Sequence, residues 1–393
     1  MFVTPTKPAS LTESHSIPRY CCASLQPFYI PSYSLTTKTN YIITLTEAPL
    51  TYRRFVVAMI TLAMILVVLA LVCLVFGSVE IPVDKIVDIL SGKGSGNKAW
   101  DIIILQSRIP MIVTAALAGA ALSISGLLLQ TTFNNPLAGP SILGVSSGAG
   151  LGVAIVILAL GGSLGGLLGE NVGSYMAILV GALIGAGVVL ALLIAFSAIV
   201  RSNTMLLIIG ILVSYLTSSV VQLLNSVATE EGVHNYVSWG FGNFSGVSAA
   251  QMPVYAGVII LALVGSALMV KPLNALLLGT RYARNLGINV SRTRNVLLAI
   301  TGVLTAVVTA FCGPIGFIGL VVPHIARMSL GTSNHARLVP ATILAGADIA
   351  LLCSLASVSS PHGIIPINAI TPIIGVPIIL YIILNRRHIQ YFN

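Results

Sequence analysis

Few residues in this chain have the types and spacing that covalent chemistry requires. A phosphate-binding loop Gly-x-x-x-x-Gly-Lys-Ser/Thr does not occur, because Gly92-Lys93 is followed by Gly94. The six histidines are dispersed without the spacing of metal ligands, at positions 15, 234, 324, 335, 362 and 388. We therefore expect no catalytic residue, no metal site and no ATP hydrolysis by such a loop.

The cysteines and one acidic residue permit more than one interpretation. Cys21 and Cys22 lie in a polar N-terminal segment, and the other three cysteines lie in apolar runs, which favours buried or incidental thiols over a disulfide framework. Asp348 lies within an apolar run, where a carboxylate could relay protons. The alternative, which we favour, is an acid that simply faces protein or water near the end of its helix.

The composition indicates a membrane protein. Only 7% of the 393 residues are charged, compared with about a quarter in ordinary soluble domains, and the hydrophobic fraction is 56%. So few charges cannot cover a soluble surface, which excludes a soluble enzyme, a nucleic-acid-binding domain and a disordered chain. The 37 glycines and few aromatic residues are typical of packed membrane helices rather than of barrel strands.

The apolar runs predict an all-α polytopic fold with about ten transmembrane helices. We expect them near residues 55–76, 102–130, 142–160, 173–199, 204–227, 252–270, 295–312, 320–331, 338–357 and 366–385. The eighth run is too short to cross a bilayer and follows Gly313-Pro314, which predicts a half-depth helix. Residues 1–52 are polar and proline-rich, so we interpret them as a disordered tail or a start-site artefact, and residues 53–393 as the ten-helix transmembrane domain.

The few charges predict the orientation. With the N-terminal end of the domain inside, the inner loops hold Arg53, Arg54, Arg201, Lys271, Arg281, Arg284, Arg292, Arg294, Arg327, Arg337, Arg386 and Arg387. The outer loops hold Lys85, Lys93, Lys98 and Arg108. This excess of inner basic residues follows the positive-inside rule and places both ends of the membrane domain in the cytoplasm.

The longest inner loop, residues 271–290, is basic and amphipathic. Glycines at 279 and 287 divide it into one or two short helices. Its apolar positions could bind another protein, or the segment could lie on anionic lipid as an interfacial helix. Composition does not separate these two alternatives.

Three long stretches resemble the FecCD/BtuC-type permease subunits of ABC importers for iron chelates, haem and cobalamin. The first has the pattern Leu-Gly-x-x-x-Ala-x-x-Leu-Gly, at Leu278, Gly279, Ala283, Leu286 and Gly287. The second and third are residues 130–149 and 313–327. The similarity runs from about residue 55 to residue 387, with the stretches in the family's order.

The resemblance implies partners and a site for one of them. A second permease subunit, identical or a paralogue, would complete the pathway, and a periplasmic binding protein would deliver the substrate. Two cytoplasmic ATPase subunits would bind ATP and Mg, so no cofactor is expected in this chain, and nucleic acid is not a partner. The ATPases would dock on the coupling loop, at Leu278, Gly279, Arg281, Ala283, Arg284, Leu286 and Gly287.

The resemblance also implies a cytoplasmic gate and an outer docking surface. The gate residues would be Asn135, Pro136, Leu137, Asn203 and Thr204. Pro136 could equally serve only to stop a helix. Of three outer arginines in cobalamin-type members, only Arg108 is matched, because Met111 and Ser357-Val358 occupy the other two positions. A different docking scheme, using Lys85, Lys93 or Lys98, is therefore an alternative.

The predicted function is ATP-driven import of a ferric siderophore by alternating access in the bacterial inner membrane. Haem and cobalamin are competing substrates within the same family. An ion-coupled secondary transporter, which would depend on Asp348, and a membrane scaffold protein are the alternatives from other classes.

Overall fold

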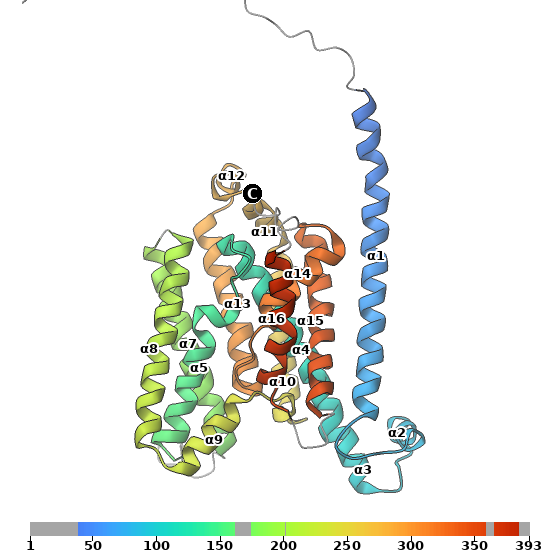
Figure 1. Ribbon diagram of the computed structural model, residues 1–393, viewed down its shortest axis with the longest axis vertical. Coiled ribbons are helices and arrows are strands. Elements are labelled where there is room, and N and C mark those ends of the chain that lie inside the picture. Colours follow the sequence, from blue (N-terminus) through green and yellow to red (C-terminus); the bar gives the residue numbers. More distant parts are fainter. Residues whose placement is uncertain (1–37, 162–173, 201, 359–364, 385–393) are drawn as a thin grey trace, which may run out of the picture. The chain divides into compact units, whose positions relative to one another are not determined.

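The structure is a computed structural model that describes residues 38–161, 174–200, 202–358 and 365–384 (Figure 1). The chain divides into two units, Met1–Ala48 and Pro49–Asn393, and the contacts described below lie within the second. Every regular element of the described residues is helical, which confirms the predicted all-α class.

A helix occurs at each of the ten predicted positions. They are α1 (Lys38–Val75), α4 (Ile109–Phe133), α5 (Val145–Ala154), α7 (Ser174–Ile199), α8 (Asn203–Val227), α10 (Met252–Leu268), α13 (Val290–Cys312), α14 (Ile318–Leu330), α15 (His335–Val358) and α16 (Ile367–Leu384). Among the described residues, six spans are each long and apolar enough to cross a membrane, and the bent pair of α10 with α11 (Val270–Leu277) makes a seventh if it is counted as one span. The remaining apolar helices, Val145–Ala159, Ile318–Leu330 and Ile367–Tyr381, are shorter.

Short helices lie at the two ends of the unit. At one end, α11 is followed by α12 (Thr280–Asn285), and we call this the α12 end (Figure 1). At the opposite end lie α2 (Val83–Leu90), α3 (Lys98–Ile102) and α9 (Glu230–Gly240), and we call this the α9 end. The segments of α2, α3 and α9 lie between the predicted spans, so these three helices were not predicted.

Helix α4 forms the centre of the unit, packed against α15, α13 and α14. Its residues are buried on all sides from Ala118 onward, as expected for a helix that is apolar all round. Glycines allow the closest approaches: a Cβ added at Gly126 would lie 1.6 Å from the carbonyl oxygen of Gly319. Close backbone contact of this kind is a main source of helix association in membranes.

The predicted break before the short helix α14 is present. Residues 313–317 are not helical, and Phe317 has a positive φ of 64°. Asn368 of α16 supplies hydrogen-bond partners for backbone groups of this stretch. Its side chain donates to the Pro314 carbonyl and accepts from the Gly316 N–H at 3.3 Å, and it also donates to the Gly240 carbonyl. Non-helical backbone at membrane depth requires protein partners of this kind.

The first helix begins earlier than expected. Helix α1 starts at Lys38, within the segment interpreted as a polar tail, while residues 1–37 lie outside the described residues. The division of the chain at residue 52 stays a prediction.

Candidate functional site

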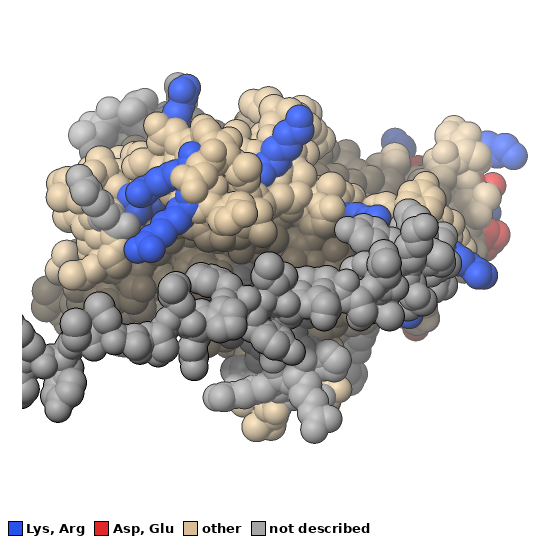
Figure 2. Space-filling view, turned by 90° about the horizontal axis from the view of Figure 1, so that it is seen from above, with Lys and Arg blue, Asp and Glu red and all other residues tan. Residues whose placement is uncertain are grey.

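The α12 end carries exposed basic side chains. Seen from this end, Lys and Arg project from the surface, and Asp and Glu appear only at a distant margin (Figure 2). The basic residues exposed here are Arg53, Arg54, Lys271, Arg281, Arg284 and Arg292. The described acids of the loops are Glu80, Asp84, Asp88, Asp101, Glu230 and Glu231, which belong to the segments of the α9 end. Among these described residues, the α12 end is therefore basic, whereas the α9 end holds the acids together with Lys85, Lys93 and Lys98.

The predicted coupling loop forms α11 and α12, with turns at Gly279 and Gly287 that have positive φ values of 94° and 81°. A β-carbon is unfavourable in that conformation, which explains the two glycines. Ala283 is fully buried and holds α12 against its own chain, so it is not part of an outer surface.

The outer side of this loop combines apolar and basic groups. Leu278, Tyr282 and Leu286 are each about 60% exposed, at 62%, 61% and 58%. Arg281 and Arg284 are exposed beside them. We call these five residues the α12 surface. Tyr282 was not among the predicted coupling residues, although it lies within the same segment and is as exposed as Leu278 and Leu286.

The predicted gate segment begins at the end of α4. Asn134 adopts the left-handed conformation that ends the helix, and the Asn135 N–H donates to the Gln130 carbonyl at 3.0 Å. The Asn135 side chain accepts from the Leu137 N–H at 2.9 Å, and the Pro136 carbonyl bonds the ring Nε2 of His324 at 2.8 Å. The turn is therefore fixed to α14.

The second predicted gate segment meets the first. Asn203 begins α8 and donates from Nδ2 to the Thr132 carbonyl at 2.8 Å. Its Oδ1 accepts from Arg294 at 3.3 Å, and Arg294 also donates to the Val200 carbonyl at 2.9 Å. Thr204 is exposed beside Asn203. Two segments that are 71 residues apart thus meet at the last turn of α4. Arg294, which was predicted only as a basic residue of an inner loop, is buried and contributes to this junction.

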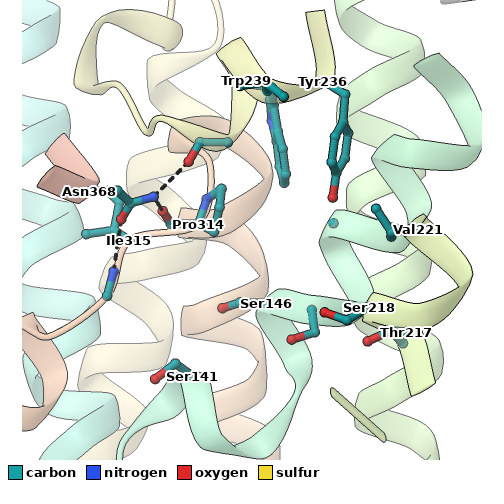
Figure 3. A pocket seen from close by; sticks show the side chains of 15 residues that line it. Ser141, Ser146, Thr217, Ser218, Val221, Tyr236, Trp239, Pro314, Ile315 and Asn368 are labelled. Carbon is teal, nitrogen blue, oxygen red and sulfur yellow. Dashed lines mark hydrogen bonds between the residues drawn. The ribbon is translucent and has the colours of Figure 1, made fainter. Parts of the chain in front are cut away.

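A cavity of about 370 Å³ lies on the α9 side of this junction, and we call it the central cavity. Figure 3 shows Tyr236 and Trp239 of α9 pointing into it from one side, with Ser146 and Ser218 on the other. The two rings stack with centroids 6.2 Å apart. Its polar lining consists of hydroxyl, indole and amide groups, from Ser141, Ser146, Ser147, Thr217, Ser218, Tyr236, Trp239 and Asn368.

The central cavity can bind a bulky solute by hydrogen bonds and ring contacts. Burial raises the pKa of Tyr236, so its phenol stays protonated near neutral pH and can donate a hydrogen bond. None of these lining residues was identified from the sequence. A partial signal was available, because Thr229 caps α9 and Tyr236 and Trp239 then follow with helical spacing.

Arg108, the predicted docking residue, lies in a buried position. Only 5% of it is exposed, and its guanidinium donates to the carbonyls of Leu74 at 2.6 Å, Val75 at 2.9 Å and Val79. These bonds satisfy backbone groups at and just beyond the end of α1. A contact with a binding protein stays a prediction, and it would require the guanidinium to leave these carbonyls.

The other two predicted docking positions come together without Arg108. Met111, Ser357 and Val358 line a cavity of about 220 Å³ at the α9 end. Its other lining residues include Ser238, Ser245 and Ser354. Of these positions only Ser357 has a hydroxyl group, and this buried hydroxyl donates to the Ile365 carbonyl at 2.5 Å.

Asp348 is buried in α15, with 6% exposed. Neither carboxylate oxygen has a hydrogen-bond partner among the described residues, and Asp348 is not part of the central cavity lining. In the described part of the chain, no three His, Cys, Asp or Glu side chains come together as a metal site.

A polytopic helical bundle with an uncharged cavity and a basic end fits a membrane transport protein. The sequence matches the model of the FecCD transport family over residues 65–385, and the chain belongs to this family. It is therefore a multi-pass permease subunit of an ABC importer, which is not itself catalytic and leaves ATP to a partner ATPase.

Individual relatives agree with this assignment. The chain is 32% identical to the vitamin B12 import system permease protein BtuC of Escherichia coli over 292 residues, which cover 73% of this chain and 85% of that protein. It is also 32% identical to a protein of Methanocaldococcus jannaschii described as an ABC transporter permease, over 77% of this chain and 89% of the relative.

A solved structure shows the same fold. It is described as the inward-facing conformation of a metal-chelate type ABC transporter. The TM-score is 0.72 at 31% sequence identity, and the match covers 84% of this chain and 98% of the other.

Proposed function

We propose that this chain, paired with a second permease subunit, forms the membrane pathway for an iron chelate, with a ferric siderophore as the first candidate. The observation that supports this proposal is the lining of the central cavity by hydroxyl, amide and aromatic groups. Such groups suit a cargo that brings its own metal ligands, because hydrogen bonds and ring contacts can hold its outer surface.

The names of two relatives support the same cargo class. One imports vitamin B12 and the other is described as a metal-chelate transporter. Both names describe metal complexes with organic ligands. Haem and cobalamin therefore remain the alternatives to a siderophore.

The positive-inside rule supports an orientation in a bacterial inner membrane in which the α12 end faces the cytoplasm. Two ATPase subunits then dock on the α12 surface, where Leu278, Tyr282 and Leu286 supply an apolar contact and the arginines pair with acidic groups. A periplasmic binding protein delivers cargo at the α9 end. Alternating access follows when ATP-bound and ATP-free partners favour different arrangements of the dimer.

Parallel uptake assays with three labelled compounds identify the cargo. Cells that lack the gene are complemented with the full chain, and uptake of labelled ferric siderophore, haem and cobalamin is measured in parallel. We expect restored uptake of the siderophore, with a loss in the Trp239→Ala variant. If only uptake of haem or cobalamin is restored, that compound becomes the cargo in place of the siderophore. If uptake of none of the three is restored, the proposal that the cargo is a metal chelate is contradicted.

The buried carboxylate of Asp348 is the specific observation that favours a second candidate, an ion-coupled carrier. That candidate requires transport driven by a gradient without ATP. Asp348→Asn would then abolish uptake.

A further inference from the structure

A chain of side-chain hydrogen bonds connects α11 to the last turn of α4. The Asn274 Oδ1 atom of α11 lies 2.8 Å from both the backbone nitrogen and the ring Nδ1 of His335, the first residue of α15. The opposite ring nitrogen, Nε2, lies 2.8 Å from the Thr131 hydroxyl of α4. His335 is fully buried, so solvent does not compete for these bonds.

Backbone groups fix the direction of each bond. A backbone N–H can only donate, so the bond from His335 N–H identifies the Asn274 atom as the oxygen. The Asn274 Nδ2 donates to the Asn334 Oδ1 at 3.1 Å, and that oxygen also accepts from the Ala336 N–H at 2.9 Å. The His335 Nδ1 therefore donates to Asn274, and in the neutral ring Nε2 accepts from the Thr131 hydroxyl.

Thr131 lies where several helices meet. Its neighbour Gln130 donates to the Leu320 carbonyl at 3.1 Å and accepts from Arg327 at 2.5 Å, which connects α4 to α14. The next residue, Thr132, accepts at its carbonyl from Asn203 of α8. The bond to His335 adds α15 and α11 to this junction, one turn before the gate segment at Asn135.

The remaining contacts of α11 are apolar. Leu273 and Leu276 are buried, and α11 packs against α15 and α4. Apolar contacts are not directional and permit sliding, whereas a hydrogen bond defines a register. The polar chain therefore gives a displacement of α11 a directed connection, with a defined register, to the end of α4.

We infer that Asn274, His335 and Thr131 form a relay that converts movement of α11 into movement of the gate segment, with His335 as the positioning residue. This inference rests on the proposed function, because it takes the α12 surface as the place where the ATPases act. The relay residues touch neither cargo nor nucleotide in this account. Their role is to keep two moving elements in register.

The test uses the complete complex of permease, ATPase and binding protein in lipid vesicles. Leu137→Cys, in a background with Cys21→Ser and Cys22→Ser, reports gate exposure through its rate of reaction with a polar maleimide. The rate is compared between the nucleotide-free and the ATP-trapped complex. The matched pair is Thr131→Val, which keeps the shape but loses the hydroxyl, and Thr131→Ser, which keeps the hydroxyl.

We expect Thr131→Val to reduce the nucleotide-dependent change in labelling rate by about fivefold, the equilibrium effect of one lost buried hydrogen bond. ATP hydrolysis continues, and Thr131→Ser behaves as the parent. Asn274→Leu should match Thr131→Val, and the double variant should be no worse than either, because both break one relay.

Equal losses in Thr131→Val and Thr131→Ser would overturn the relay, since packing would then be the cause. Additive losses in the double variant would overturn it as well. An unaltered labelling change in Thr131→Val overturns the relay alone. A parent complex whose gate labelling does not respond to nucleotide overturns the proposed function together with it.

Discussion

Around the last turn of α4, side-chain hydrogen bonds join several helices, whereas on the α9 side of this junction hydroxyl groups and aromatic rings line a cavity. The junction at Gln130, Thr131 and Thr132 illustrates the first arrangement. The central cavity illustrates the second, because its serines, Tyr236 and Trp239 face open space. We expect the first region to move as a coupled set and the second to admit a solute.

The short helix α14 connects the two regions. Its preceding turn at Gly316 is held by Asn368 beside the central cavity, while His324, two turns later, bonds the Pro136 carbonyl of the gate segment. The short helix α14 therefore reaches from the cavity wall to the predicted gate segment. Because the chain is not helical at residues 313–317, α14 begins beside the cavity and has one end in each region.

The largest effect is expected from Gly126→Val, which disrupts both ends at once. The added side chain would meet the Gly319 carbonyl, and overpacking against backbone should destabilise the fold by more than about 3 kcal/mol. Expression of monodisperse protein in detergent, measured by size-exclusion chromatography, should be lost. Gly187→Ala, where a Cβ meets nothing within 4 Å, is the control and should remain folded.

Charge reversal should break the α12 end alone. Arg281→Glu combined with Arg284→Glu should reduce the partner ATPase recovered in co-purification by at least about tenfold, since like charges across an interface are strongly unfavourable. The matched control is Lys93→Glu with Lys98→Glu, two exposed lysines of the opposite end. Equal recovery with both pairs would mean that the α12 surface is not the docking site.

Trp239→Ala should break the α9 end alone. Aromatic contacts contribute about 0.5–1.5 kcal/mol each, so cargo uptake should fall by about two- to tenfold. The amount of bound ATPase should not change, because α9, which contains Trp239, lies at the opposite end of the unit from α12 (Figure 1). Parallel loss of uptake and ATPase binding would show that the two ends are not separable in this way.

The smallest effect is expected from Asp348→Asn. The carboxylate has no hydrogen-bond partner among the described residues, and the substitution preserves its shape, so ATP-driven uptake should change by less than about twofold. Uptake assays in vesicles at saturating ATP measure this directly. A complete loss would favour the ion-coupled alternative.

The sequence predicted the helices well because a long run of apolar residues is by itself enough to indicate a buried or membrane-embedded helix. The ten helix positions, the break before α14 and the basic character of the 271–290 loop all follow from local composition. The prediction of gate residues at Asn135 and Asn203 came from the resemblance, and the structure joins both segments at the last turn of α4.

Long-range partners were not predictable in the same way. Arg108 and Arg294 were assigned to loops, yet both are buried and donate to backbone carbonyls of other segments. Every residue has a backbone carbonyl, so the residue types in a sequence do not show which carbonyl will accept a hydrogen bond from a given arginine. The aromatic pair of the central cavity was missed because α9 was treated as an outer loop.

Transport by the reconstituted complex tests whether this chain forms the pathway for ATP-driven import of a ferric siderophore. The full chain is placed in vesicles with its ATPase and binding protein, and uptake of labelled ferric siderophore is followed with ATP, without ATP, and with an imposed ion gradient alone. This account predicts uptake only with ATP and only with both partners present. Uptake driven by the gradient in vesicles that lack the ATPase would contradict it.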